Sequence, residues 1–222
     1  RLVYKTHEAF LAPVADACPC VFVARSGLDS ALSLFRHWRD TKPRYREAAA
    51  NQSGLPPAPL EDAAAFLDAW LDDFDGFGAP RGGVGAWLET VRSWWDRRRH
   101  PNVALVHFAD LKRDARGQIA KVAAHCGIGV DDAALDATCD HSSLAYMRRH
   151  ERWFELDTLE PGAFLRGGGA DGGGAATFSR AQIDRYEAVL ADGLGADCRR
   201  WLRDGGDVPK GGDDADPPPS GA

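Results

Sequence analysis

The chain has 222 residues, 44% of them hydrophobic, with seven Trp and ten Phe. This length and apolar content suit one well-buried domain. The formal net charge of −6 argues against nucleic acid or an anionic membrane as a partner, so any anion site has to be a local basic cluster. No apolar run approaches the length needed to cross a membrane, so we expect no membrane-spanning segment.

The five cysteines do not follow a disulfide or metal-binding pattern. Their number is odd, and Cys18 and Cys20 form the one close pair. No His lies beside that pair at the spacing of a zinc site, so we expect no bound metal. Reduced thiols fit a reducing compartment, which favours the cytoplasm.

The first candidate element is residues 2–7, LVYKTH, whose β-branched and aromatic residues favour a strand or the end of one. In an extended segment Lys5 and His7 point to the same side, because side chains alternate along a strand. Taken alone, a Lys and a His so placed are ordinarily a solvated pair.

Residues 21–38, VFVARSGLDSALSLFRHW, predict a strand, a tight turn and a helix. Residues 21–24 form an apolar run of the length of a buried strand, and residues 26–28 form a turn. Asp29 stands where a helix N-cap is expected. The apolar face of the helix follows at helical spacing, with Ala31, Leu34, Phe35 and Trp38.

Two polar side chains in this stretch are candidates for binding phosphate. Arg25 stands where the strand ends, and Ser33 lies one turn into the helix. In open α/β sheets, ligands bind at the carboxyl ends of strands beside helix N-termini, and a guanidinium there can hold a phosphate. The alternative is that Arg25 only pairs with a carboxylate such as Asp29.

The segment VARSGLDSALSLFRHW resembles the sulfotransferase segment that reads roughly VARNPKDVAVSYYHF. This resemblance implies that Arg25 and Ser33 hold the 3′-phosphate of 3′-phosphoadenosine-5′-phosphosulfate (PAPS). Cytosolic small-molecule sulfotransferases also carry a K-[ST]-H element shortly before this arginine, which implies that His7 is the catalytic base and Lys5 its electrostatic partner. An imidazole can take the acceptor's proton near neutral pH, and an ammonium can stabilise the departing nucleotide.

In the middle of the chain, residues 40–59 hold four Pro with Gly, Asn and Ser, and are expected to form a loop. By the resemblance this loop shapes acceptor specificity; otherwise it is a plain surface loop. Helices are expected over residues 60–74 and 86–99, and NVALVHF at 102–108 predicts a second buried strand. Phe108 stands where sulfotransferases place a Tyr that reaches the cofactor phosphate, a contact worth about 1 kcal/mol.

Helices are also expected over residues 114–126 and 131–140, followed by HSSLAYMRR, which resembles the HTSFxxMKK of sulfotransferases. The resemblance implies that Ser142 contacts the adenosine end of the cofactor. Leu144 replaces the Phe that packs on adenine, so packing is kept without aromatic stacking.

The segment FLRGG at 164–168 resembles the FxRKG element of the family. The resemblance implies that Arg166 and Gly168 close on the 3′-phosphate, while Gly167 replaces a Lys. Residues 179–182, SRAQ, predict a capping box that opens a further helix.

Together these patterns lead us to expect an α/β fold, with a P-loop-NTPase-like parallel sheet flanked by helices and incomplete at the N-terminus. Residues 1–203 are the expected sulfotransferase domain. Residues 204–222, rich in Gly, Asp and Pro, are the expected disordered tail. The expected function is transfer of a sulfuryl group from PAPS to the hydroxyl or amine of a small-molecule acceptor, without a metal.

One family element has no counterpart in residues 1–222, namely the phosphate loop of the form YPKSGTTW. The chain is therefore either part of a longer sulfotransferase, which a first residue other than Met favours, or a degenerate member. Two alternatives for the function stay open. One is a non-catalytic module that binds 3′-phosphoadenosine nucleotides, and the other is a nucleotide kinase, against which the absence of GxxxxGK[ST] counts.

Overall fold

The computed structural model describes residues 3–7, 9–53, 61–73, 83–165 and 173–209. Strand β1 (Cys20–Ala24) pairs in parallel with β2 (Val103–His107), and Ala24 lies opposite His107. Both strands therefore end at the same edge of the sheet, immediately before Arg25 and Phe108. The expected α/β class, with parallel strands flanked by helices, is confirmed.

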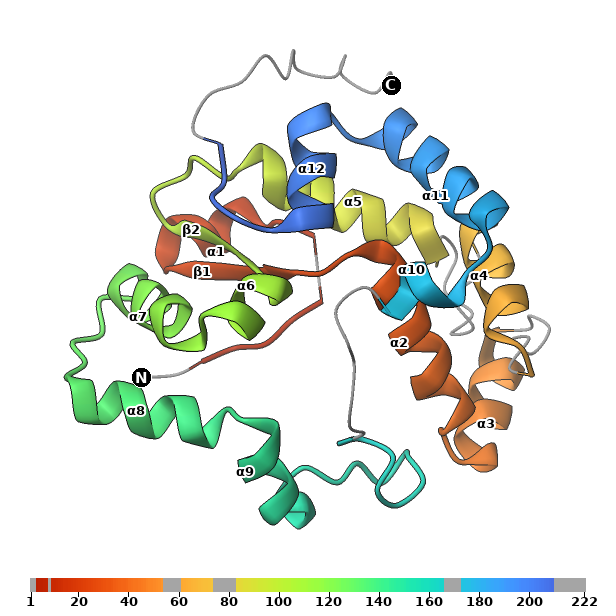
Figure 1. The fold of residues 1–222 in the computed structure, drawn as a ribbon, viewed down its shortest axis with the longest axis horizontal. Coiled ribbons are helices and arrows are strands. Elements are labelled where there is room, and N and C mark those ends of the chain that lie inside the picture. The colour runs from red at the N-terminus through yellow and green to blue at the C-terminus, as the bar shows by residue number, and fades with distance from the viewer. Residues whose placement is uncertain (1–2, 8, 54–60, 74–82, 166–172, 210–222) are drawn as a thin grey trace.

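Helices surround the two strands (Figure 1). In the first half of the chain they are α1 (Ala12–Ala17), α2 (Gly27–Arg39), α3 (Pro43–Ser53), α4 (Ala63–Leu71) and α5 (Gly83–Asp96). After β2 come α6 (Phe108–Arg113), α7 (Ala115–His125), α8 (Asp132–His141), α9 (Leu144–Arg149), the 3₁₀ turn η1 (Glu151–Trp153), α10 (Gly173–Thr177), α11 (Arg180–Gly193) and α12 (Ala196–Asp204).

The core is built around the apolar face of α2. Phe35 and Trp38 of this helix are buried against residues from α4, α5, α11 and α12, among them Phe66, Trp70 and Trp201. Burying one such side chain contributes about 1.5–3 kcal/mol. A smaller cluster on the sheet stacks Phe22 on Trp94, with ring centroids 5.5 Å apart. Helix α2 is therefore held firmly, and with it the residues at its N-terminus.

Three local expectations are wrong. Residues 43–53 form α3 rather than a loop: Pro43 opens the helix, where its missing N–H costs nothing, and good helix formers follow. Helix α2 begins at Gly27 with Ser26 as its N-cap, so Asp29 lies inside the first turn. Residues 3–7 have no regular secondary structure and are exposed.

Among the expectations for the C-terminal part of the chain, one is confirmed and one is wrong. The capping box is present, because the Ser179 hydroxyl accepts from the Gln182 N–H and the Gln182 side chain accepts from the Ser179 N–H. Residues 204–222 were expected to form a disordered tail, but Asp204 ends α12 and the Gly206 N–H donates to the Asp110 carboxylate at 2.9 Å. Residues 210–222 lie outside the described residues, and the division of the chain at residue 203 stays a prediction.

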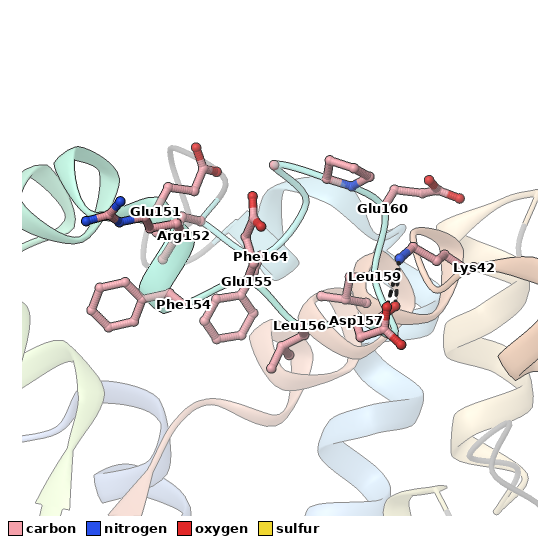
Figure 2. Close-up of a pocket in the computed structure, with 13 residues that line it drawn as sticks. Lys42, Glu151, Arg152, Phe154, Glu155, Leu156, Asp157, Leu159, Glu160 and Phe164 are labelled. Carbon is pink, nitrogen blue, oxygen red and sulfur yellow. Dashed lines mark hydrogen bonds and ion pairs between the residues drawn. The ribbon is translucent and has the colours of Figure 1, made fainter.

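The segment after α9 folds back onto the end of α2. The Lys42 N–H donates to the Thr158 carbonyl at 2.9 Å, and Thr41 forms an antiparallel bridge with Leu159. Between this segment and Lys42 lies a cavity of about 340 Å³, shown in Figure 2. The cavity lies at the C-terminal end of α2, whereas Arg25 precedes its N-terminus.

Candidate functional site

The candidate site lies where both strands end and α2 begins. The guanidinium of Arg25 lies over the Phe108 ring, 5.0 Å from its centroid, a distance at which a cation is attracted to an aromatic face. Its Nε is 3.8 Å from Asp29 Oδ2, close enough for an ion pair but not for a hydrogen bond. Nε is buried and has no hydrogen-bond partner among the described residues. The site therefore holds a positioned cation with an unused donor.

Asp29, which pairs with Arg25, also binds Gly174, a residue far along the chain. It is 5% exposed, and its Oδ1 accepts from the Gly174 N–H at 2.8 Å. A Cβ at Gly174 would lie 2.6 Å from the Leu28 carbonyl carbon, so only glycine fits so close to α2. The pair expected as the alternative role of Arg25 is thus present, and the same carboxylate also anchors α10.

Tyr186 of α11 closes the other side of the turn. Its hydroxyl accepts from the Gly27 N–H at 3.1 Å, and a Cβ at Gly27 would lie 2.7 Å from the tyrosine. Burial raises the pKa of the Tyr186 hydroxyl above its usual range, although the hydrogen bond from Gly27 acts in the opposite direction. The sequence analysis missed Tyr186 and Gly174. The one local signal for such a contact is Gly27, because a glycine lets another group approach the backbone closely, but it does not identify the partner.

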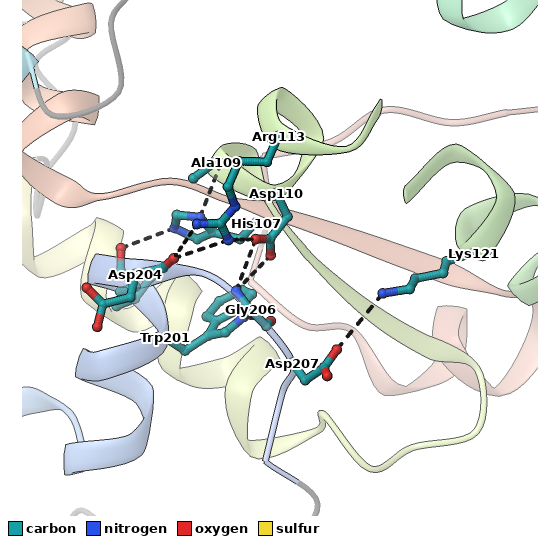
Figure 3. Close-up of polar contacts among 10 residues, drawn as sticks. His107, Ala109, Asp110, Arg113, Lys121, Trp201, Asp204, Gly206 and Asp207 are labelled. Carbon is teal, nitrogen blue, oxygen red and sulfur yellow. Dashed lines mark hydrogen bonds and ion pairs between the residues drawn. The ribbon is translucent and has the colours of Figure 1, made fainter. Parts of the chain in front are cut away.

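The carboxyl end of β2 is held by a buried polar cluster, shown in Figure 3. His107 is 3% exposed, and its Nε2 lies 3.1 Å from the Leu202 carbonyl, which can only accept, so Nε2 carries the proton. Its Nδ1 accepts from the Ala109 N–H at 3.2 Å. Asp110 pairs with Arg113 and accepts from the Gly206 N–H. With both ring nitrogens engaged, His107 has a structural role, fixing the turn that presents Phe108.

Among the described residues, no hydrogen bond or ion pair joins the side chain of Ser33, Lys5 or His7 to Arg25. Ser33 lies on α2, four residues after Asp29, and is exposed. Lys5 and His7 lie in the exposed segment 3–7.

The predicted adenosine contacts lie at the junction of α8 and α9. Ser142 caps α8, and its hydroxyl donates to the Cys139 carbonyl at 3.2 Å. Leu144 is the first residue of α9 and is 39% exposed, so an apolar side chain faces solvent there. Arg166 and Gly168 lie outside the described residues.

Two further observations concern the described part of the chain. Its helices include none that is long and apolar enough to cross a membrane. Its His, Cys, Asp and Glu side chains do not form a group of three or more that could hold a metal ion.

Comparison with known proteins identifies the family. The sulfotransferase domain matches residues 3–195. Sulfotransferase 1A1 of Canis lupus familiaris is 26% identical over 192 residues, which are 82% of this chain and 58% of that protein. Sulfotransferase 1C2 of Rattus norvegicus is 24% identical over 186 residues, 80% of this chain and 55% of that protein. The chain thus spans a little over half the length of these relatives.

Solved structures share the fold. Mouse sulfotransferase SULT7A1 complexed with PAP superposes with a TM-score of 0.68 at 22% identity, covering 89% of this chain and 67% of that one. Retinol dehydratase in complex with androsterone and the inactive cofactor PAP gives a TM-score of 0.63 at 19% identity, covering 83% of this chain and 50% of that one. With the match to the sulfotransferase domain over residues 3–195, these likenesses show that the chain belongs to the sulfotransferase family.

Proposed function

We propose that this chain belongs to an enzyme that moves a sulfuryl group from PAPS to the hydroxyl or amine of a small-molecule acceptor. The observation that carries the proposal is the Arg25 guanidinium, whose buried Nε has no hydrogen-bond acceptor among the described residues. An unsatisfied buried donor costs about 1–3 kcal/mol. A phosphate oxygen at this position satisfies the donor and matches the charge of the guanidinium.

The roles of the surrounding residues follow from this placement. The Phe108 ring and the Asp29 carboxylate orient the guanidinium from two sides, so that it meets the 3′-phosphate in one geometry. On the resemblance of the sequence alone, we assign further contacts with the same phosphate to Ser33, Arg166 and Gly168. PAPS is the proposed sulfuryl donor because the solved relatives contain PAP.

The adenosine end of PAPS is assigned to Ser142, through its hydroxyl, and to Leu144, whose exposed side chain is free to pack on the base.

The proposed chemistry is an in-line transfer. The acceptor oxygen or nitrogen attacks sulfur, the bond from sulfur to the 5′-phosphate oxygen breaks, and His7 takes the acceptor's proton. Lys5 stabilises the negative charge that remains on the nucleotide. Small-molecule acceptors are supported by the retinol dehydratase complexes, which contain androsterone or retinol.

The reduced thiols of the cysteines are the basis on which we propose a cytoplasmic location. All five lie in described residues, and none forms a disulfide.

A second candidate is a module that binds 3′-phosphoadenosine nucleotides without catalysis. Residues 1–222 by themselves contain no counterpart of the phosphate loop YPKSGTTW, so nucleotide binding without catalysis is the alternative for this part of the protein. Sulfation assays of the complete protein with labelled PAPS and a panel of phenols and amines separate the two, since only an enzyme yields labelled product.

Titration calorimetry with two nucleotides tests the phosphate site. The parent chain should bind adenosine-3′,5′-bisphosphate more tightly than adenosine-5′-monophosphate, and Arg25→Ala should remove most of that difference. Arg92→Ala, which removes one exposed positive charge on α5, is the matched control and should keep it. Equal affinity of the parent for the two nucleotides would refute the assignment of Arg25.

A further inference from the structure

Cysteine thiols gather at the amino end of β1, the end opposite to Arg25. Cys18 is the C-cap of α1, and Cys20 is the first residue of β1. Cys126 is the C-cap of α7 and lies close enough for its charge to act on the Cys20 thiol. Because β1 has 5 residues and each rises about 3.3 Å, these thiols lie about 17 Å from the edge that holds Arg25.

The side chains of Cys18 and Cys20 lie on the same side of the chain. The backbone at Cys18 is extended, with φ −157° and ψ 156°, and side chains two residues apart in extended backbone share a face. The Cys20 thiol donates to the Cys18 carbonyl at 3.5 Å, and the two thiols are within hydrogen-bond reach of each other. Two residues of extended chain span about 6.6–7.2 Å at most, and a disulfide accepts Cα separations of about 4.4–6.8 Å. A small contraction at Pro19 therefore allows the two sulfurs to bond.

The two thiols differ in their access to solvent. Cys18 is exposed, and its thiol donates to the Val14 carbonyl at 3.3 Å. Cys20 is half-buried, and its main chain is held on both sides. Its N–H donates to the Asn102 carbonyl at 2.7 Å, and its carbonyl lies 3.1 Å from His125 Nε2. A reagent in solution therefore meets the Cys18 thiol first, with the Cys20 thiol directly behind it.

The environment of Cys20 makes it the slower nucleophile while both thiols are reduced. Burial raises the pKa of the Cys20 thiol, and the neighbouring Cys18 thiol raises it further. The thiolate is the nucleophile, so a raised pKa leaves little of the reactive form at neutral pH. The share due to Cys18 ends once the Cys18 sulfur is bound in a disulfide. Reaction at Cys18 therefore favours the thiolate of Cys20.

We propose that Cys18 and Cys20 form a thiol–disulfide exchange site that takes a small disulfide of the glutathione class. The Cys18 thiolate attacks one sulfur of glutathione disulfide, the S–S bond breaks, and the first glutathione leaves as a thiolate that takes up the proton lost by Cys18. The Cys20 thiolate then attacks the Cys18 sulfur, and the second glutathione leaves with the proton lost by Cys20. Two protein thiols are thereby oxidised, and one glutathione disulfide is reduced to two thiols. The inference goes beyond the proposed function and does not depend on it.

Tryptic peptides distinguish the possible products. The folded chain is incubated with glutathione disulfide, the remaining thiols are blocked with N-ethylmaleimide, and the digest is analysed by mass spectrometry. Residues 6–25 form one tryptic peptide with Cys18 and Cys20, and residues 122–148 form another with Cys126 and Cys139. The parent should yield peptide 6–25 with an internal disulfide and no glutathione. Glutathione retained on Cys18, a bond between the two peptides, or no reaction of either cysteine overturns the proposal.

A pair of matched thiol variants tests the second step. Cys20→Ser removes the attacking thiol and should leave glutathione on Cys18, with about tenfold or more adduct than the parent at the same time, because a thiol in the same chain acts at a high effective concentration. Cys139→Ser removes a thiol of α8 outside the cluster and should give the products of the parent. Thermal melting checks that both variants keep the fold. If Cys20→Ser holds no more glutathione than Cys139→Ser, Cys20 does not carry out the second step and the proposal is wrong.

Discussion

A single methyl group at Gly174 should loosen the contact between α10 and α2. The added Cβ of Gly174→Ala would lie 2.6 Å from the Leu28 carbonyl carbon and 2.8 Å from the Asp29 nitrogen. Both are backbone atoms, so neither can rotate away, and α10 has to move by most of an ångström. That movement stretches the 2.8 Å hydrogen bond from the Gly174 N–H to the buried Asp29 carboxylate.

Two terms set the magnitude of this change. A hydrogen bond to a charged group contributes about 1.5–3 kcal/mol, and crowding a packed interior costs about 1–3 kcal/mol. Because α10 can relax in part, we expect the free energy of unfolding to fall by about 2–4 kcal/mol. Urea unfolding followed by tryptophan fluorescence measures this value, since the chain has seven Trp.

Gly129→Ala is the matched control, because a Cβ at Gly129 would meet no atom within 4 Å. It should leave the free energy of unfolding within about 0.5 kcal/mol of the parent value. If Gly174→Ala is as stable as Gly129→Ala, α10 does not lie against the first turn of α2 as described, and Asp29 is not anchored there.

Three further predictions concern Tyr186, Phe108 and His7. Burial raises the pKa of the Tyr186 hydroxyl in the folded state, so the contribution of this residue to the free energy of unfolding is complete below the unfolded pKa of about 10 and is lost as the pH rises above it. Thermal melts should therefore show stability falling more steeply above about pH 10 for the parent than for Tyr186→Phe. Parallel curves for the two proteins would contradict this. Phe108→Tyr should bind adenosine-3′,5′-bisphosphate about fivefold more tightly in calorimetry, because a hydroxyl contact is worth about 1 kcal/mol, and unchanged affinity would exclude a phosphate beside that ring. In a complete protein with the phosphate loop, His7→Ala should lower turnover at saturating PAPS by about 10²–10⁴ while nucleotide affinity is kept, and full turnover would place the base elsewhere.

Local patterns in the sequence were sufficient for most of the secondary structure. A strand over residues 21–24, observed as Cys20–Ala24, and the helix after it were predicted from an apolar run and from apolar residues at helical spacing, signals that depend only on neighbours. The position of Arg25 followed from the same pattern, because a strand, a turn and a helix in direct succession place the intervening residue at the sheet edge. Residues 43–53 were misjudged because the four prolines of residues 40–59 were taken as loop signals, although the first of them, Pro43, opens a helix.

Tertiary structure alone decided what surrounds Arg25. Asp29 looked like a helix cap from its neighbours, but its carboxylate is bound by Gly174, 145 residues away, and the Gly27 N–H is bound by Tyr186, 159 residues away. Such partners have no signature in local periodicity, because chain folding brings them together across many intervening residues. The sequence by itself therefore determined which elements form and where a cation stands at the sheet edge. The packing of α10 and α11 against the first turn of α2 decided how that cation is held and which donor it leaves for a ligand.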